Sequence, residues 1–304
     1  MVGIALKVIS VAAFLAMSAF LKGADGIPSG QLVFYRSIFA LIPIVAFLAW
    51  RRELIDGMKT AHPLSHLGRG LVGALGMSLG FFALTRLPLP EAVAIGYATP
   101  LLIVVMSAVF LREHVRLYRW SAVLIGLVGV AIMISPRISL FSGGPGLTGG
   151  ASLGAIASLA GCVVGASAAL LVRRMVQTER SATIVFYFSI TCSVVALLTI
   201  PFGWVWPTPQ QAALLIAAGI AGGIGQVTLT ESYRYADMSV IAPFEYVSLV
   251  FSIIVGNIFF GDVPTTEMLI GSVIVVAAGI FIIYREHRLG LERKRARRVT
   301  PPQG

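Results

Sequence analysis

The chain has 304 residues, of which 57% are hydrophobic and 12% are charged, and its mean hydropathy is +0.91. Soluble domains carry about 25% charged residues, so this composition excludes an ordinary soluble enzyme, a disordered chain and a water-soluble nucleic-acid-binding protein. The formal net charge is +10, and the basic residues gather in short clusters between long apolar runs. The class that fits is an all-α polytopic membrane protein.

Ten segments are long and apolar enough to cross a bilayer, because a spanning helix needs about 20 mostly apolar residues. The runs lack the alternation of barrel strands, which favours helices throughout. In chain order the predicted spans lie near 2–21, 29–50, 67–86, 89–111, 118–135, 151–172, 182–203, 210–232, 238–260 and 267–284. The first has no basic start or A-x-A cleavage site and contains Lys7, so we expect a retained helix instead of a signal peptide.

The basic residues predict the topology, because Arg and Lys concentrate on cytoplasmic loops. With the N-terminus inside, the inner segments, which include Arg69, hold 18 of the 23 basic residues. The outer loops hold three, namely Lys22, Arg86 and Arg137. We therefore predict an inner (plasma) membrane protein with both termini cytoplasmic. The basic tail after the last span fits this topology and contact with anionic lipid headgroups better than nucleic-acid binding.

The two halves of the chain resemble each other. Val33–Ile38 and Val185–Ile190 agree at five of six positions at an offset of 152, which also aligns Lys22 with Arg174. An offset of 149 pairs Gly73 with Gly222, Gly76 with Gly225, Tyr97 with Tyr246 and Glu113 with Asp262. These matches fall on equivalent spans and indicate two copies of a five-helix unit.

Five is an odd number, so the second unit must enter the membrane from the side opposite to the first. Such inverted repeats are typical of secondary transporters, whose binding site lies near the bilayer midplane between the halves. The predicted organisation is a first repeat over 1–137, a connecting loop over 138–150, a second repeat over 151–284 and a basic tail over 285–304. The loop contains the Gly143–Gly146 seam.

Short motifs on several spans carry a resemblance to a known family. They are Phe34–Ser37 at the start of span two, Pro100 in span four, Phe110–Glu113 at its end, Ser239–Pro243 at the start of span nine and Phe260–Asp262 at its end. Over roughly residues 3 to 284, the chain resembles the drug/metabolite transporter superfamily, specifically its EamA-type ten-helix members. The family often has Gly-Glu at the two span ends where this chain has Arg112-Glu113 and Gly261-Asp262; the acidic residue retains a helix-capping or loop-anchoring role.

The resemblance implies a secondary transporter that moves a small organic metabolite by alternating access. Ser29-Gly30-Gln31 before the Phe34–Ser37 motif looks most like the riboflavin-importing branch, so riboflavin uptake is the specific prediction. Amino-acid or metabolite export and S-adenosylmethionine transport are the alternatives within the superfamily. A non-transporting membrane scaffold and a membrane-embedded enzyme are the alternatives of other classes.

Ionisable residues inside a span are costly and need a partner or a wet cavity. Arg36 lies about two turns into span two, where it either donates to an anionic or carbonyl-rich substrate group or serves as a helix-pairing strut. Glu245, in span nine, either binds a proton or substrate or pairs with Lys7 or Arg234. Glu231 is expected to pair locally with Arg234.

Uncharged polar residues complete the predicted substrate site. Tyr35, Tyr97, Tyr187 and Tyr246 form two repeat-related pairs, whose rings and hydroxyl groups suit a cavity as well as ordinary packing. The substrate-binding prediction comprises Arg36, Tyr35, Tyr97, Gln226, Glu245 and Tyr246. Pro100 and Pro243 are predicted kinks, each freeing a backbone carbonyl.

The chain also contains glycine spacings and short matches to enzyme motifs. GxxxG spacings in spans three and eight predict close helix packing. The G-x-S-x-G matches lie in apolar helices without the strand that a nucleophile elbow requires, and His62 and His66 have Pro63 between them and no further ligand nearby. We expect no catalytic site, cofactor, metal or nucleic-acid partner; the partners are a small-molecule substrate and the lipid bilayer, with a homodimer left open.

Overall fold

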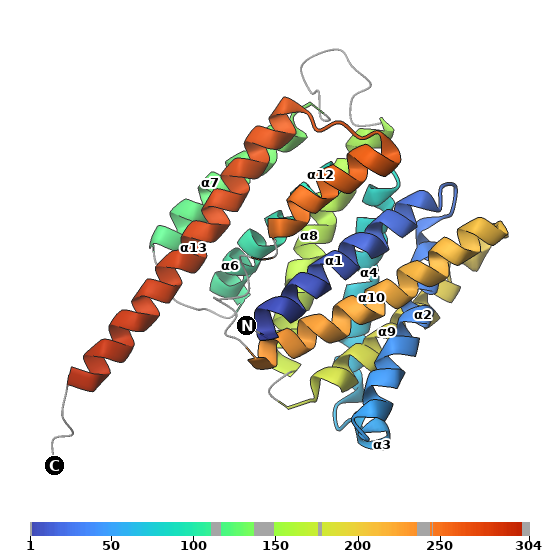
Figure 1. Ribbon diagram of the computed structural model, residues 1–304, viewed down its shortest axis with the longest axis horizontal. Coiled ribbons are helices and arrows are strands. Elements are labelled where there is room, and N and C mark those ends of the chain that lie inside the picture. The colour runs from blue at the N-terminus through green and yellow to red at the C-terminus, as the bar shows by residue number, and fades with distance from the viewer. Residues whose placement is uncertain are drawn as a thin grey trace.

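The computed structural model describes residues 2–110, 117–136, 149–175, 178–235, 244 and 246–299, and the regular elements in these ranges are helical (Figure 1). They are α1 Val2–Gly23, α2 Ser29–Trp50, α3 Leu54–Gly57, α4 Pro63–Leu84, α5 Leu89–Gly96, α6 Ala98–Phe110, α7 Leu117–Ile134, α8 Gly150–Met175, α9 Ser181–Leu197, the 3-10 turn η2 Ile200–Phe202, α10 Pro209–Tyr235, α12 Val247–Phe260 and α13 Thr266–Val299.

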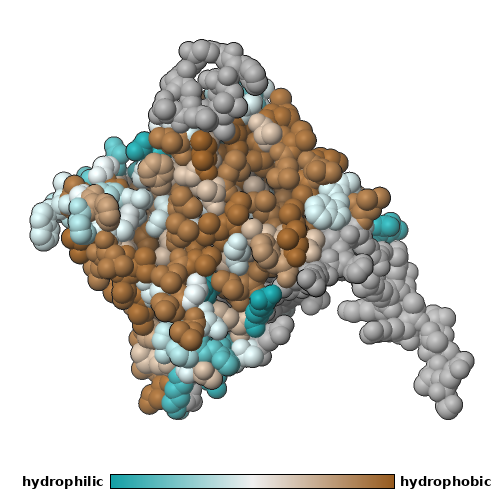
Figure 2. Space-filling view, turned by 180° about the vertical axis from the view of Figure 1, so that it is seen from behind, coloured by the Kyte–Doolittle hydropathy of each residue, from teal (hydrophilic) through white to brown (hydrophobic). Residues whose placement is uncertain are grey.

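Ten apolar helical spans are confirmed in the described part of the chain. Eight are long enough to cross a bilayer by themselves, with α5 and α6 together forming one of them, and α9 and α12 are shorter apolar helices. Figure 2 shows that one face of the molecule is largely hydrophobic, with hydrophilic residues toward its margins. The all-α polytopic membrane fold predicted from the sequence is therefore correct.

Three span boundaries differ clearly from the prediction. The seventh span, predicted to end near 203, ends as α9 at Leu197, before the 3-10 turn η2. The third span begins at Pro63, because proline suits the first turn of a helix, and this places Arg69 well inside α4 instead of at its edge. The last span continues as helix to Val299, so most of the predicted basic tail is an extension of α13. The predicted Gly143–Gly146 seam and the predicted kink at Pro243 lie outside the described residues.

Span four is broken where α5 ends at Gly96 and α6 begins at Ala98. Pro100 has no N–H to donate to the carbonyl of Gly96, so the regular helical hydrogen bonds cannot continue through this turn. The Tyr97 N–H instead donates to the Ala94 carbonyl at 3.1 Å in a tighter turn. The irregularity is thus centred on Tyr97, three residues before the proline, which itself sits in the tolerated first turn of α6.

The helix pairs of the two repeats are equivalent, as if a two-fold axis related one repeat to the other. In Figure 1, α1 lies along α10, and its counterpart α8 packs in the same way on α4. Helix α2 packs on α10 as α9 packs on α4, and three pairs of counterparts contact each other: α2 with α9, α5 with α12, and α7 with α13. Each helix therefore meets the partner that a pseudo-two-fold axis between the repeats requires.

Repeat-related residues lie toward opposite ends of the bundle. We call the end where α1 begins, and where α2 and α10 end, the N-terminal face. The Tyr187 hydroxyl donates to the Met58 carbonyl at 2.8 Å near this face. Phe34, beside the matching Tyr35, instead packs on Trp204 near the opposite face, with ring centres 5.3 Å apart. This placement agrees with the inverted relation of the two five-helix units.

The glycine faces pack helices closely, as predicted. A Cβ atom at Gly219 of α10 would lie 2.8 Å from the carbonyl oxygen of Tyr35, and one at Gly223 would lie 2.7 Å from that of Ala40. Both distances are shorter than real Cβ contacts allow, so α10 can approach α2 only with glycine at these positions.

Candidate substrate-binding site

A pocket of about 250 Å³ lies between the two halves of the molecule. Helices α1 and α5 of the first half and α10 and α12 of the second form its wall. Its lining comprises Lys7, Ser10, Val11, Phe14, Leu15, Ser18, Val93, Gly96, Tyr97, Leu229 and Ser248. We call it the central pocket, and it combines apolar walls with a few polar groups, as small-molecule sites do.

Tyr97 and Tyr246, which are equivalent in the two repeats, meet at this pocket. Their ring centres are 5.1 Å apart and the ring planes make an angle of 66°. Tyr97 is 5% exposed, and its hydroxyl oxygen lies 2.5 Å from Oγ of Ser248. Because equivalent residues of a two-fold pair touch only near the axis, the tyrosine pair lies close to the axis. The break between α5 and α6 directs Tyr97 to this position.

The same break brings a backbone group to the pocket. Gly96, whose carbonyl lacks a donor at Pro100, is part of the lining. The Cys162 thiol approaches that carbonyl oxygen at 4.0 Å, a weak contact. Gly96 thus contributes to the pocket lining, and contact of its carbonyl with a bound molecule stays a prediction.

The pocket also contains polar residues that sequence reasoning did not assign to it. Lys7, Ser10, Phe14 and Ser18 recur at helical spacing and so share one face of α1. Lys7 is 4% exposed, and the Ser10 hydroxyl donates to the Gly225 carbonyl of α10 at 2.8 Å. The periodicity was visible in the sequence, but nothing there showed that this face of α1 points to the axis.

Arg36 lies next to the central pocket and is not part of its lining. Its side chain is 5% exposed, and its Nε atom has no hydrogen-bond partner in the described part of the chain. The guanidinium carbon is 5.7 Å from the ring centre of Phe188. A Cβ atom on Gly222 would lie 3.2 Å from Nε, so this glycine makes room for the arginine.

The other predicted site residues are more dispersed. Tyr35 is partly buried and stacks on Phe39 with ring centres 5.9 Å apart. Gln226 is partly buried on α10 and does not line the central pocket. Glu245 lies outside the described residues, and so does its predicted pairing with Lys7 or Arg234. The assignment of these residues to substrate binding remains a prediction.

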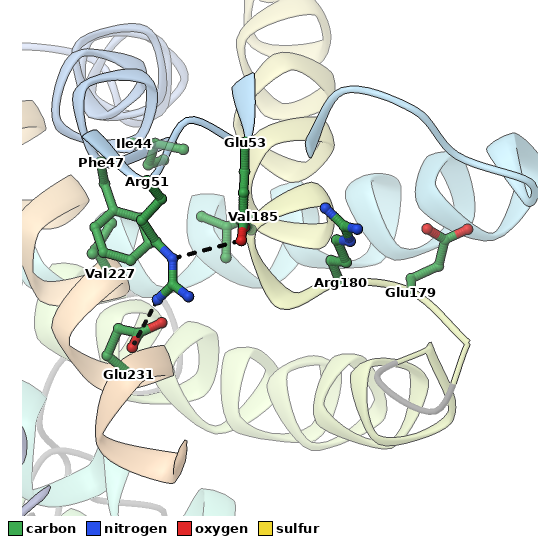
Figure 3. A pocket seen from close by; sticks show the side chains of 10 residues that line it. Ile44, Phe47, Arg51, Glu53, Glu179, Arg180, Val185, Val227 and Glu231 are labelled. Carbon is green, nitrogen blue, oxygen red and sulfur yellow. Dashed lines mark ion pairs between the residues drawn. The ribbon is translucent and has the colours of Figure 1, made fainter. Parts of the chain in front are cut away.

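A second pocket, of about 410 Å³, opens at the N-terminal face between α2, α9 and α10. Figure 3 shows Arg51 between Glu53 and Glu231, with Arg180 and Glu179 farther along the connection into α9. Arg51 Nη1 lies 3.6 Å from Glu231 Oε2, and Arg51 Nε lies 3.8 Å from Glu53 Oε1. Glu231 thus pairs with Arg51 of α2; the side chain of Arg234, its predicted partner, lies outside the described residues.

Glu179, between α8 and α9, binds the connection between α3 and α4 at the same face. Its carboxylate accepts a hydrogen bond from the Thr60 hydroxyl at 2.7 Å and one from the Ala61 N–H at 3.3 Å. His66 Nε2 lies 3.7 Å from the other carboxylate oxygen. The bond from Thr60, supported by His66, lowers the pKa of Glu179 below its ordinary value.

A comparable ionic link lies at the opposite face. Asp262 accepts a hydrogen bond from the Leu89 N–H at 2.8 Å, at the first residue of α5, and its carboxylate lies 3.4 Å from Lys22 Nζ. The acidic residue after span nine therefore anchors α12 to α1 and α5, which is the loop-anchoring role expected for it. Its repeat equivalent, Glu113, lies outside the described residues.

Comparison with known proteins agrees with this architecture. Residues 1–135 and 152–285 each match the model of the EamA-like transporter family. An S-adenosylmethionine uptake transporter of Rickettsia bellii is 27% identical over 93% of this chain and 92% of its own length. A pseudopaline exporter of Pseudomonas aeruginosa is 28% identical (91% and 94%), and a riboflavin transporter of Rhizobium johnstonii is 28% identical (88% and 85%).

A protein of known crystal structure shares the fold, with a TM-score of 0.67 at 21% identity over 94% of this chain and 98% of that chain. An inverted pair of five-helix units with a pocket between them is the architecture of a secondary transporter. The chain belongs to the EamA-like transporter family, and it is accordingly a transporter and not an enzyme.

Proposed function

We propose that this chain is a secondary transporter that moves a small organic metabolite across the inner (plasma) membrane by alternating access. The central pocket carries the proposal, because both halves line it and the repeat-related tyrosines meet beside it. Two inverted halves that rock against each other expose a pocket on their axis to one side of the membrane and then to the other.

The proposed orientation places the N-terminal face in the cytoplasm. Arg51, Arg180 and the basic end of α13 lie at this face, whereas Lys22 and Arg86 lie near the other. The ionic links then have a role in the cycle. Lys22 with Asp262 joins the halves on the outer side, and Arg51 with Glu231 joins them on the inner side, so each link stabilises the closed state of that side.

Riboflavin uptake remains the specific substrate prediction, with S-adenosylmethionine and amino-acid-derived metabolites as alternatives. The relatives are named for S-adenosylmethionine uptake, pseudopaline export and riboflavin transport, at nearly equal identity. An aromatic pair beside a partly polar pocket suits the ring systems of riboflavin and of S-adenosylmethionine equally well.

Uptake by the full-length protein in liposomes tests the proposal. We expect counterflow of labelled riboflavin, S-adenosylmethionine or an amino acid, and Tyr97→Ala should reduce it at least tenfold because it removes one ring of the axial pair. Tyr284→Ala is the matched control, since Tyr284 is 57% exposed on α13. Correctly folded protein that transports no member of the panel would contradict the transporter assignment, and a Tyr97→Ala variant with full uptake would contradict the site.

A further inference from the structure

Two cations, the buried Arg36 and the partly buried Arg69, share one aromatic ring within the bundle. The guanidinium carbon of Arg69, on α4, lies 4.2 Å from the ring centre of Phe188, and that of Arg36, on α2, lies 5.7 Å from the same centre. Phe188 belongs to α9, so three helices converge on this point. The two like charges therefore lie against the same ring.

Neither arginine has an acidic partner in the part of the chain that the structure describes. Nε of Arg36 and Nε and Nη1 of Arg69 are buried without a hydrogen-bond acceptor, and so are the hydroxyl groups of Ser37 and Ser189. Buried charges are normally paired, because the cost of removing them from water must be offset. Two partly exposed cations of the described chain do have acidic partners, Arg51 with Glu231 and Lys22 with Asp262.

Glycines make the space that these side chains occupy. A Cβ atom on Gly73 would collide with Arg69 Nη1 and lie 2.5 Å from a ring atom of Phe188, and one on Gly222 would lie 3.2 Å from Arg36 Nε. Phe188 by itself offers both cations a favourable ring face. A ring face, however, neither neutralises two positive charges nor satisfies their N–H donors.

We propose that Arg36 and Arg69 together bind a carboxylate group of the transported molecule. Their planar forks match a carboxylate in geometry and charge, and the nearby serine hydroxyls can donate to the same group. Arg36 is one helical turn along α10 from the central pocket, because Gly222 borders Arg36 and Gly225 borders the pocket residue Phe14.

This assignment rests on the proposed transport function and narrows its substrates. A carboxylate subsite favours amino-acid-derived metabolites such as S-adenosylmethionine over riboflavin, which has no carboxylate. The aromatic part of such a molecule would remain at the Tyr97–Tyr246 pair while its carboxylate engages the arginines.

Thermal-shift titration of the full-length, detergent-purified protein tests the subsite. The probes are S-adenosylmethionine, glutamate and histidine, the decarboxylated analogue of each, riboflavin, and sodium chloride at matched ionic strength. We expect at least one carboxylate compound to stabilise the wild type and its decarboxylated analogue to do so at least tenfold more weakly. R36Q and R69Q should each weaken the carboxylate compound about tenfold or more, because each removes a charge-assisted hydrogen bond.

The matched control is R86Q, because Arg86 also lies over an aromatic ring, 4.8 Å from the centre of Phe82, but is exposed. It should bind as the wild type does. R36K and R69K, which keep the charge, should retain part of the affinity and serve if a glutamine variant does not fold.

Several outcomes would overturn the proposal. They are equal stabilisation by acids and decarboxylated analogues, stabilisation by chloride alone, no response to any carboxylate, or unchanged carboxylate binding in both glutamine variants. Liposome uptake separates this failure from that of the transport function. Riboflavin uptake that is insensitive to R36Q would retain the transporter and remove the carboxylate subsite, whereas absence of all uptake would contradict transport itself.

Discussion

The two halves of the molecule treat one pair of equivalent positions differently. Arg36 and Phe188 are the mismatch within the otherwise repeated Val33–Ile38 and Val185–Ile190 segments, and they contact each other across the α2–α9 pairing. Their supports are also equivalent, because Arg36 lies over Gly222 and Phe188 lies over Gly73.

The difference shows what the repeats keep and what they change. The glycines and the helix pairing are the same in both halves, so the packing that closes the bundle is preserved. The equivalent side chains are Arg36 in the first half and Phe188 in the second. Arg69 lies over Phe188, and no second cation matches it, since its repeat equivalent is Ala218. The two repeats therefore share their helix packing, whereas Arg36 and Arg69 of the first repeat have no cationic equivalent in the second.

Removing the ring should have the largest effect. Phe188 is 6% exposed, so Phe188→Ala leaves a cavity and takes the shared aromatic face from both arginines. We expect a loss of about 3–4 kcal/mol in stability, typical of a buried Phe→Ala change, measured by thermal unfolding in detergent. Phe259→Ala, at a residue that is 74% exposed, should remain close to wild type; equal losses in the two variants would argue against a structural centre at Phe188.

Filling one of the two glycine supports should have the next largest effect. Gly73→Val forces a side chain against Arg69 and Phe188, and overpacking of this kind costs about 1–3 kcal/mol. Gly68→Val, on the same helix with no atom within 4 Å of its Cβ position, is the control for helix propensity. Unfolding temperatures of the two variants should differ clearly, and Gly73 has no packing role if they coincide.

The tyrosine pair should show a smaller difference. Tyr97→Phe keeps the ring beside Tyr246 and removes the hydroxyl that contacts Ser248, so we expect a loss of about 1 kcal/mol. Tyr284→Phe, on the exposed face of α13, should have no effect on the same unfolding measurement. A Tyr97→Phe variant as stable as the wild type would show that the hydroxyl contact contributes nothing.

The smallest effect should be the pH dependence of the Glu179 link. The lowered pKa means that its stabilisation is complete above the ordinary carboxyl pKa of about 4.3 and is lost as the pH falls through the lower folded-state pKa. Wild type should therefore lose more unfolding temperature between pH 7 and pH 4 than Glu179→Gln. Glu267→Gln, in the first turn of α13, should follow the wild type; a Glu179→Gln profile identical to both would contradict the link.

The sequence predicted features that depend on neighbouring residues better than features that depend on contacts between distant helices. The spans followed from hydropathy, and the break in span four followed from Pro100, although the irregularity is at Tyr97 because proline disrupts the turn that precedes it. Lys7 was read only as a reason against a signal peptide, and Arg69 as a charge at the membrane edge. The first error concerns the direction in which a face of α1 points, and the second concerns the residue at which α4 begins. A hydropathy profile averages over a window of residues and shows neither.

The ten spans, the two five-helix units and their inverted relation could be predicted from the residues alone, since they depend on local apolarity, on repeated residues and on an odd number of crossings. The folded structure was needed to show that Arg36 and Arg69, on different helices, share the ring of Phe188, and that one face of α1 lines the central pocket. Those contacts depend on the rotation and tilt of helices far apart in the chain, which arise from packing. The periodicity of α1 shows that its polar residues share one face, but not which way that face points.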